Sequence, residues 1–276
     1  MSIAPETALG PVRLAVADLD RSRDYYQRAI GLEALETGSG RALLGAGARP
    51  LVELVEQAGA APSHGHTGLY HLALLLPERR DLARWLAHAA RERVPLAGLS
   101  DHGVSEAIYL SDPDGHGIEI YRDRPRDLWE GAVRERMTTL PLDVDDLLGE
   151  LEALEPYEGT PAGTVMGHVH LKVASIPETV AFYRDAVGLD LVLAFGPEAA
   201  FLSAGGYHHH VGANTWESAG ATPAPEGSAR LLQATIVLPG AAERDRVLER
   251  LDWWESDDGP LAADPSGNTL LFSVAR

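Results

Sequence analysis

The sequence AIYLSDPDGHGIEIY, residues 107–121, places a loop rich in Pro, Asp and Gly between two strand-like runs. In the second run, Ile118 and Ile120 share one face of the expected strand, so Glu119 points to the other face. A carboxylate between two isoleucines is costly to bury unless it is paired or bound to a metal ion. We therefore expect Glu119 to have partners elsewhere in the chain, and we infer that these are histidines and a metal ion.

Composition limits the classes of protein and of site. The 276 residues are 45% hydrophobic and 23% charged, which is ordinary for one large or two average globular domains. A net charge of −18 argues against nucleic acid and anionic membrane as partners, because both require a basic surface. No apolar run reaches transmembrane length and no signal segment is evident, so we expect a cytoplasmic protein. The absence of cysteine restricts any metal site to nitrogen and oxygen ligands.

The first half of the chain gives the order strand, helix, strands twice. Residues 12–20 alternate like a strand, residues 22–32 predict a short amphipathic helix, and residues 42–56 read as strand, turn and strand. Residues 68–77 then form an apolar strand, residues 79–93 show helical spacing of apolar side chains, and the 107–121 stretch follows.

The second half repeats this pattern. VHLKVASIPETVAFYRDAVGLDLV (169–192) aligns without a gap to VRLAVADLDRSRDYYQRAIGLEAL (12–35). DPSGNTLLF (264–272) repeats the frame of DPDGHGIEI (112–120). Two repeats at similar offsets predict an internal duplication, and each half holds two strand–helix–strands modules.

The segment between the halves breaks the pattern, because it contains a short acidic helix over residues 143–154 followed by Pro and Gly. We predict a first domain at residues 1–140 with modules 1 and 2. We predict a linker with a short helix at 141–163 and a second domain at 164–276 with modules 3 and 4.

This organisation resembles the vicinal-oxygen-chelate superfamily, which includes glyoxalases, bleomycin-resistance proteins and extradiol ring-cleaving dioxygenases. The opening frame VxLxVxDL and the closing frame DPDGxGIEIY carry the resemblance, which covers nearly the whole chain outside the linker. It implies an α+β fold of four βαβββ modules in two tandem domains, in which each pair of modules forms a curved mixed sheet, or cup. It also implies that metal ligands lie on the first and last strands of modules and point into the cup.

The resemblance gathers the metal ligands in modules 2 and 3. A ligand on a first strand lies seven residues before the Asp of the opening frame, where module 3 has His168. Module 2 offers His71 on its first strand and Glu119 on its last. His170 lies on the same strand face as His168 and competes with it as the ligand.

Modules 1 and 4 lack these ligands. Module 1 has Pro11 at the place of His168, and the first strand of module 4, ARLLQATIV (229–237), contains no histidine. Leu271 stands in module 4 at the place of Glu119.

Two imidazoles and one carboxylate make up the facial triad of non-haem Fe(II) oxygenases, which leaves open positions for a bidentate catecholate and for O₂. The resemblance therefore implies Fe²⁺ as cofactor, and Mn²⁺ suits the same ligands. The ligand pattern is most similar to the catechol-2,3-dioxygenase type that spreads its site over both halves of the chain.

The same resemblance implies two catalytic residues. Extradiol enzymes have a Tyr ten residues before the Glu and four before the turn Pro, and Tyr109 has both spacings. They also have an acid–base His in the frame H-x-V/I-A/G, which His209 fits best within the cluster His208–His210. An imidazole suits this role because its pKa is close to neutral pH. Which histidine of the cluster acts is left open.

The expected substrate-binding residues are His102, His170 and His210. Each candidate residue also has a purely structural interpretation. Glu119 would be a solvated edge-strand residue, His71 a hydrogen-bonded core residue, His208–His210 a surface cluster and Tyr109 a core aromatic residue.

We expect Fe(II)-dependent extradiol cleavage of a catechol-like aromatic diol with O₂, in a chain that forms a homodimer. A glyoxalase-like isomerase or lyase is the alternative, although such enzymes usually add a fourth ligand, commonly a second Glu. A non-catalytic small-molecule-binding protein is the third interpretation, but such members generally lack the triad.

Overall fold

The computed structural model of the chain describes residues 2–153 and 156–275. Within these residues the chain folds into four βαβββ modules, which confirms the predicted fold class. The elements of modules 1 and 2 are β2 (Val12–Val16), α1 (Leu19–Tyr25), η1 (Tyr26–Ile30), β3 (Glu33–Gly38), β4 (Arg41–Ala46), β5 (Arg49–Glu56), β7 (Gly68–Leu75), α2 (Arg79–Glu92), β8 (Gly98–Asp101), β9 (Ser105–Ser111) and β10 (Gly117–Asp123). The elements of modules 3 and 4 are β12 (Val165–Lys172), α5 (Ile176–Ala181), η3 (Phe182–Val187), β13 (Asp190–Phe195), β14 (Ala199–Ser203), β15 (Val211–Asn214), β16 (Ser228–Leu238), α6 (Ala241–Leu248), β17 (Trp253–Ser256), β18 (Gly259–Ala263) and β19 (Thr269–Val274).

The described strands form two curved mixed sheets, and each sheet takes modules from both halves of the chain. Modules 1 and 4 share a ten-stranded sheet through the antiparallel pair β2 and β16. Modules 2 and 3 share a nine-stranded sheet through the antiparallel pair β7 and β12. The sequence repeats do not by themselves determine which modules share a sheet. The predicted domain limits, 1–140, 141–163 and 164–276, stay a prediction.

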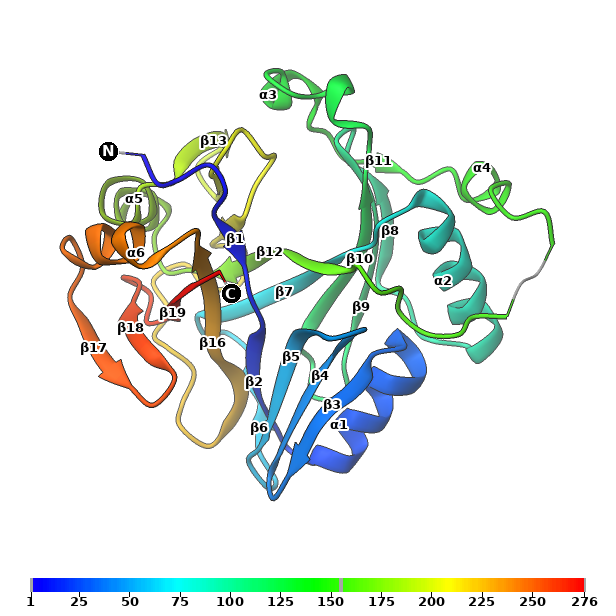
Figure 1. Ribbon diagram of the computed structural model, residues 1–276, viewed down its shortest axis with the longest axis horizontal. Coiled ribbons are helices and arrows are strands. Elements are labelled where there is room, and N and C mark those ends of the chain that lie inside the picture. Colours follow the sequence, from blue (N-terminus) through cyan, green and yellow to red (C-terminus); the bar gives the residue numbers. More distant parts are fainter. Residues whose placement is uncertain (1, 154–155, 276) are drawn as a thin grey trace.

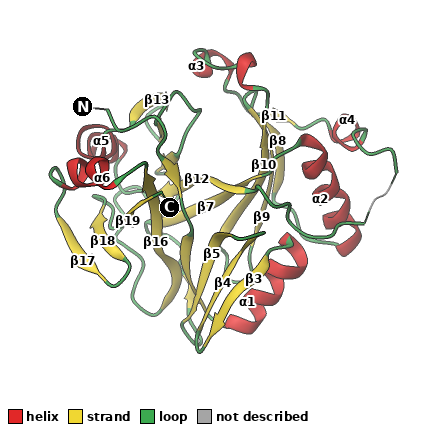
Figure 2. Cartoon of the chain, viewed as in Figure 1, coloured by secondary structure: helices red, strands yellow, loops and turns green. Residues whose placement is uncertain are grey.

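The helices lie outside the two sheets, and the strands β7 and β12 cross the centre of the molecule (Figures 1 and 2). Helix α2 packs against β10 through one face that buries Leu82, Trp85, Leu86 and Ala89. This is the apolar stripe that the helical spacing of residues 79–93 predicted. The concave side of the sheet of modules 2 and 3 is therefore left for the site.

The two DPxG turns fold in the same way in both halves. Asp112 Oδ1 accepts hydrogen bonds from the backbone N–H groups of Asp114 and His116, at 2.9 and 2.8 Å. The hydroxyl of Tyr26 in module 1 donates to the other oxygen of Asp112 at 3.3 Å. Tyr183 of module 3 donates in the same way to Asp264 of module 4 at 3.2 Å. These bonds fasten the modules of each half together, while strand pairing joins the halves.

Two helix predictions need adjustment. The helix expected over residues 22–32 begins at Leu19, because the side chain of Asp18 caps it by accepting from the N–H of Arg21. It ends at Gly31, whose φ of 93° suits glycine. The helix expected over residues 143–154 is shorter, and residue 154 lies outside the described residues.

Short elements complete the fold: β1 (Ala8–Leu9), β6 (Ala61–Pro62), η2 (Arg126–Leu128), α3 (Val133–Arg136), β11 (Leu140–Pro141) and α4 (Val144–Leu148). In the described part of the chain, every helix is too short or too polar to cross a lipid bilayer.

Candidate metal centre

Three strands bring the predicted ligands around one small residue, Ala73. On β10, Glu119 is the register partner of Ala73, and on β12 His168 is its register partner on the other side. His71 precedes Ala73 by two residues on β7, so its side chain points to the same face. Ala73 is fully buried, and its methyl group leaves space that a larger side chain would fill.

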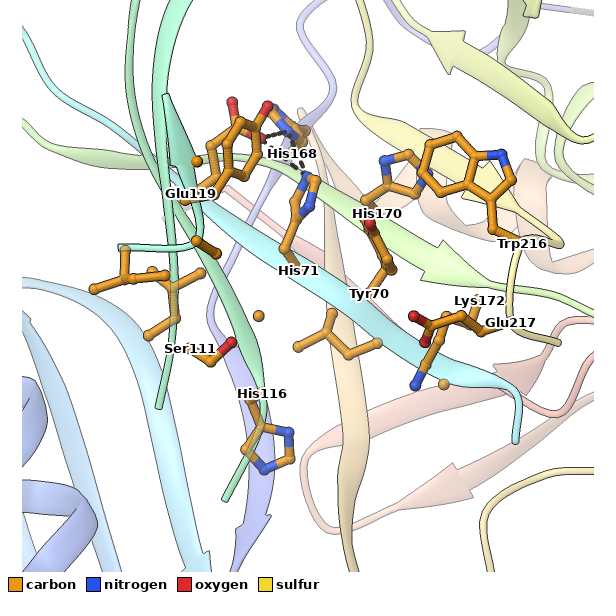
Figure 3. A pocket seen from close by; sticks show the side chains of 18 of the residues that line it. Tyr70, His71, Ser111, His116, Glu119, His168, His170, Lys172, Trp216 and Glu217 are labelled. Carbon is orange, nitrogen blue, oxygen red and sulfur yellow. Dashed lines mark hydrogen bonds and ion pairs between the residues drawn. The ribbon is translucent and has the colours of Figure 1, made fainter. Parts of the chain in front are cut away.

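The three candidate ligand side chains converge there (Figure 3). Oε2 of Glu119 lies 3.0 Å from Nε2 of His71 and 3.1 Å from Nε2 of His168. The two Nε2 atoms are 3.3 Å apart. All three residues are buried, so the interpretation of Glu119 as a solvated edge-strand residue is wrong.

Two glycines permit this convergence. A Cβ at Gly117, the partner of His71 on β10, would lie 2.0 Å from the carbonyl oxygen of Tyr70. A Cβ at Gly167, where β12 bulges beside His168, would lie 1.8 Å from the hydroxyl oxygen of Tyr121. Close backbone approach and a bulge are the usual reasons for glycine inside a strand.

The protonation states suit a cation. Burial acts to raise the pKa of Glu119, but the imidazoles of His168 and His71 outweigh it and hold that pKa well below its usual range. Burial lowers the pKa of His168 to about 4, so this imidazole is neutral at neutral pH. An ionised carboxylate and a neutral imidazole are the forms that bind metal ions.

The donor set fits a divalent transition metal. The ligand atoms of His71, Glu119 and His168 all lie within 4.8 Å of one another. Two imidazole nitrogens and one carboxylate oxygen on one face match a facial triad. A cation between them would also compensate the charge of the buried carboxylate.

The triad lies at one side of a cavity of about 630 Å³. The predicted residues Tyr109, His102, His170 and His209 all line it. A volume of this size suits a small aromatic molecule.

Tyr109 stands beside the triad because it is the register partner of Glu119 on β9. Burial, with the nearby carboxylate of Glu119, raises the pKa of Tyr109 well above its usual value, so its hydroxyl stays protonated. Nε2 of His102 lies 2.7 Å from this hydroxyl, and Nδ1 of His102 lies 2.8 Å from the carbonyl oxygen of Thr138. If Nδ1 donates to that carbonyl, Nε2 is the acceptor for the tyrosine hydroxyl.

His209 ends a hydrogen-bonded chain that starts at a carboxylate. Oδ1 of Asp123 lies 2.9 Å from Nε2 of His208, whose Nδ1 lies 2.8 Å from Nδ1 of His209. If Asp123 accepts from His208, neutral His208 accepts in turn from Nδ1 of His209. Nε2 of His209 is then the basic nitrogen of a ring whose centroid lies 4.1 Å from that of His168. Burial lowers the pKa of His209 well below its usual value, which keeps this base neutral.

The histidine cluster differs from its prediction in one respect. Strand alternation would put His209 on one face and His208 and His210 on the other, but these residues precede β15, which begins at Val211. His208 and His209 therefore contact each other, and both are buried, so the interpretation as a surface cluster is wrong. Nδ1 of His210 lies 3.0 Å from Oγ of Ser203 and 3.2 Å from the N–H of Ala204. Among the described residues that line the cavity, His210 is absent, so its position does not support the prediction that it binds substrate.

His170 points into the cavity without joining the triad. Its Nε2 is buried and has no hydrogen-bond partner among the described residues. The rings of Tyr70, Phe201 and Trp216 surround it, with centroids 5.2 to 5.8 Å from that of His170. On β15 its register partner is Gly212, where a Cβ would lie 2.9 Å from Nδ1 of His170.

Sequence reasoning missed Asp123 and His208. Asp123 lies four residues after Glu119 on β10, so strand alternation places both on one face. The spacing from Glu119 could therefore have predicted that Asp123 faces the site. The position of His208 could not be predicted in this way, because it depends on how the irregular segment before β15 folds.

Comparison with known proteins shows the family of the chain. The profile of the Glyoxalase/Bleomycin resistance protein/Dioxygenase superfamily matches residues 8–120. A Bacillus subtilis (strain 168) protein described as catechol-2,3-dioxygenase is 42% identical over 259 residues, which are 91% of this chain and 89% of the relative. The chain belongs to this superfamily.

Solved structures of the superfamily share the fold. The crystal structure of another Bacillus subtilis protein aligns with 99% of this chain and 86% of its own, with a TM-score of 0.67 at 13% identity. Glyoxalase I from Zea mays aligns with 97% of this chain and 92% of its own, with a TM-score of 0.59 at 17% identity. At these identities the similarity shows the fold alone.

Proposed function

We propose that the protein is a metal-dependent extradiol dioxygenase that cleaves a catechol-like aromatic diol with O₂, and that its metal ion is Fe²⁺. The observation that carries the proposal is the buried triad His71–Glu119–His168 in a chain 42% identical to a relative described as catechol-2,3-dioxygenase. Fe²⁺ held by the triad would supply positions for two vicinal oxygens and for O₂, and the redox capacity that joins them.

The residues around the triad supply proton transfer and orientation. In this proposal, Nε2 of His209 takes a proton from the diol and returns it later. The hydroxyl of Tyr109 donates to Nε2 of His102, which orients it, and its oxygen accepts a hydrogen bond from a hydroxyl group of the substrate. The unpartnered Nε2 of His170 offers the ring or its substituents a further polar contact.

One register position argues against the isomerase alternative. In module 2, Glu119 lies opposite Ala73, two residues beyond the ligand His71. The matching position in module 3 lies opposite His170, two residues beyond His168, and it is Gly212. A glycine supplies no fourth carboxylate, so the site keeps a three-ligand set with open positions.

The test is oxygen consumption by Fe²⁺-reconstituted protein with 4-methylcatechol. We expect one O₂ consumed per diol and a yellow ring-opened product. Protein that holds one Fe²⁺ but cleaves no catechol would contradict the proposal. Isomerisation of a hemithioacetal by the same protein would then favour the glyoxalase-like alternative.

The cytoplasmic location and the homodimer stay predictions. The absence of nucleic-acid and membrane partners also stays a prediction, based on the net charge of −18.

A further inference from the structure

The chain contains a single lysine, Lys172, among 276 residues, and this lysine lines the cavity of the proposed site. The other basic residues that make up the 23 Lys and Arg are arginines. Lys172 lies on β12, four residues after His168 and two after His170, so the three side chains share one face of the strand.

Lys172 lacks a fixed partner in the folded chain. Among the described residues, no hydrogen bond or ion pair engages its ammonium group, although its side chain is partly buried. Glu217 lies next to it in Figure 3, on an exposed segment and beyond ion-pair distance. Burial lowers the pKa of Lys172, and the charge of Glu217 only partly opposes that shift. An anion in the cavity would therefore find a cation that is already partly desolvated.

A second cation lines the same cavity. The guanidinium of Arg230 is hydrogen-bonded to Oε1 of Gln57 at 3.0 Å and to the carbonyl oxygen of Ser228 at 3.3 Å. Both partners are neutral, so its charge is uncompensated by any carboxylate within the described residues. The acidic residue Asp114 also lines the cavity, but it is ion-paired with Arg21.

The spacing between Lys172 and the triad suits one substituted aromatic ring. His170 is the register partner of His71, so Lys172 lies two residues, about 7 Å, beyond His71 along the strand. In Figure 3, Tyr70 and His170 lie between the triad and Lys172, and Trp216 lies on the far side of His170 from the triad. The rings of Tyr70 and Trp216 contact each other and that of His170, and they offer a surface for an aromatic group.

We propose that Lys172 binds an anionic substituent of the substrate, so that the protein prefers a catechol with a short carboxylate side chain to a neutral catechol. This inference rests on the proposed function for the diol and the triad. The carboxylate replaces water at the ammonium group, while the ring occupies the space between Lys172 and the metal ligands. In a chain with net charge −18, such a substrate needs a local cation to overcome the repulsion of the whole molecule.

The single lysine allows a test that does not depend on turnover. An amine-reactive acetylating reagent labels Lys172 and the α-amino group, and the two are resolved by peptide mass spectrometry. With the full chain, we expect 3-phenylpropionate to protect Lys172 while leaving α-amino labelling unchanged. The matched neutral probe, 3-phenylpropan-1-ol, should protect neither. Equal protection by acid and alcohol, or by neither, would overturn the inference.

Kinetics then separate this inference from the proposed function. We expect kcat/KM for 3-(3,4-dihydroxyphenyl)propionate to exceed that for its methyl ester by about tenfold, and Lys172→Met to bring the ratio close to one. Cleavage of both compounds at equal rates by wild-type protein would overturn the role of Lys172 and leave the dioxygenase proposal intact. Protection of Lys172 by the acid without cleavage of either compound would support the anion site and contradict the dioxygenase proposal.

Discussion

The two sheets share one plan but differ in the side chains at matching positions. In the sheet of modules 1 and 4, Leu271 of β19 is the register partner of Thr235 of β16. The hydroxyl of Thr235 donates to the carbonyl oxygen of Pro11 at 2.8 Å. Gln233 lies two residues before Thr235 on the same strand face. These four positions form the counterpart of the metal centre, with no imidazole and no carboxylate among them.

In the sheet of modules 2 and 3 the corresponding positions are His71, Ala73, Glu119 and His168. The comparison shows that the βαβββ frame requires only apolar and hydrogen-bonding residues there. A metal centre requires three ligands and a small residue between them. The two frames therefore differ in the side chains that they bury, because one buries leucine, threonine and glutamine while the other brings together two imidazoles and a carboxylate.

The largest expected effect is loss of a ligand. Glu119→Gln keeps the shape of the side chain but removes its charge. Loss of a residue that only hydrogen-bonds to a metal ligand lowers metal affinity by about 10–100-fold, so we expect loss of the ligand charge to lower Fe²⁺ affinity by more than about 100-fold. Activity should disappear with the metal. The control is Gln233→Ala, at the position of the other sheet that matches His71, and it should leave metal content at one ion per chain in elemental analysis. Equal metal loss in both variants would refute the distinction between the sheets.

A bulky residue at position 73 should have nearly the same effect. Ala73→Leu fills the space between the ligands, so we expect metal binding to be lost, with a fall in unfolding free energy of about 1–3 kcal/mol from overpacking. Thr235→Leu is the control, since it overpacks the other sheet at a comparable cost. Calorimetry gives the stability, and iron analysis should separate the two variants.

His209 should affect turnover without affecting the metal. We expect His209→Gln to retain Fe²⁺ and to lower kcat by about 10²–10⁴-fold, the usual contribution of a general acid or base. Stopped-flow absorbance with 4-methylcatechol measures this. Unchanged kcat would show that another group transfers the proton.

Asp123 should have a smaller effect, because it acts through His208. Asp123→Asn removes the charged acceptor that fixes the His208 tautomer, so we expect kcat to fall by less than about 10²-fold while KM stays constant. A rise in KM with unchanged kcat would instead indicate a structural role at the cavity wall.

The smallest effect is expected at Gly212. A Cβ there would contact Nδ1 of His170 at 2.9 Å, so Gly212→Ala should shift that ring and raise KM a few-fold, with the metal retained. Complete loss of metal would mean that His170, rather than His168, holds it.

Local patterns and the family resemblance were sufficient to predict that Glu119, His71 and His168 lie together, because alternation fixes the strand face of each residue and the resemblance indicates which strand positions can carry ligands. They were insufficient for the module pairing. Whether module 2 joins module 1 or module 3 depends on which sheet edges meet, and strand sequences do not encode that contact locally. Alternation also failed at His208–His210, since the rule applies only inside a strand and these residues lie before one. Inside β10, by contrast, strand alternation predicts correctly that Asp123 shares a face with Glu119.

The most direct test of the proposed metal centre is anomalous diffraction at the iron edge from crystals grown without oxygen and loaded with Fe²⁺ and 4-methylcatechol. We predict one iron peak in contact with His71, Glu119 and His168, with both diol oxygens bound to it and no peak beside Thr235. An iron peak in the sheet of modules 1 and 4, or a diol bound away from the triad, would contradict it.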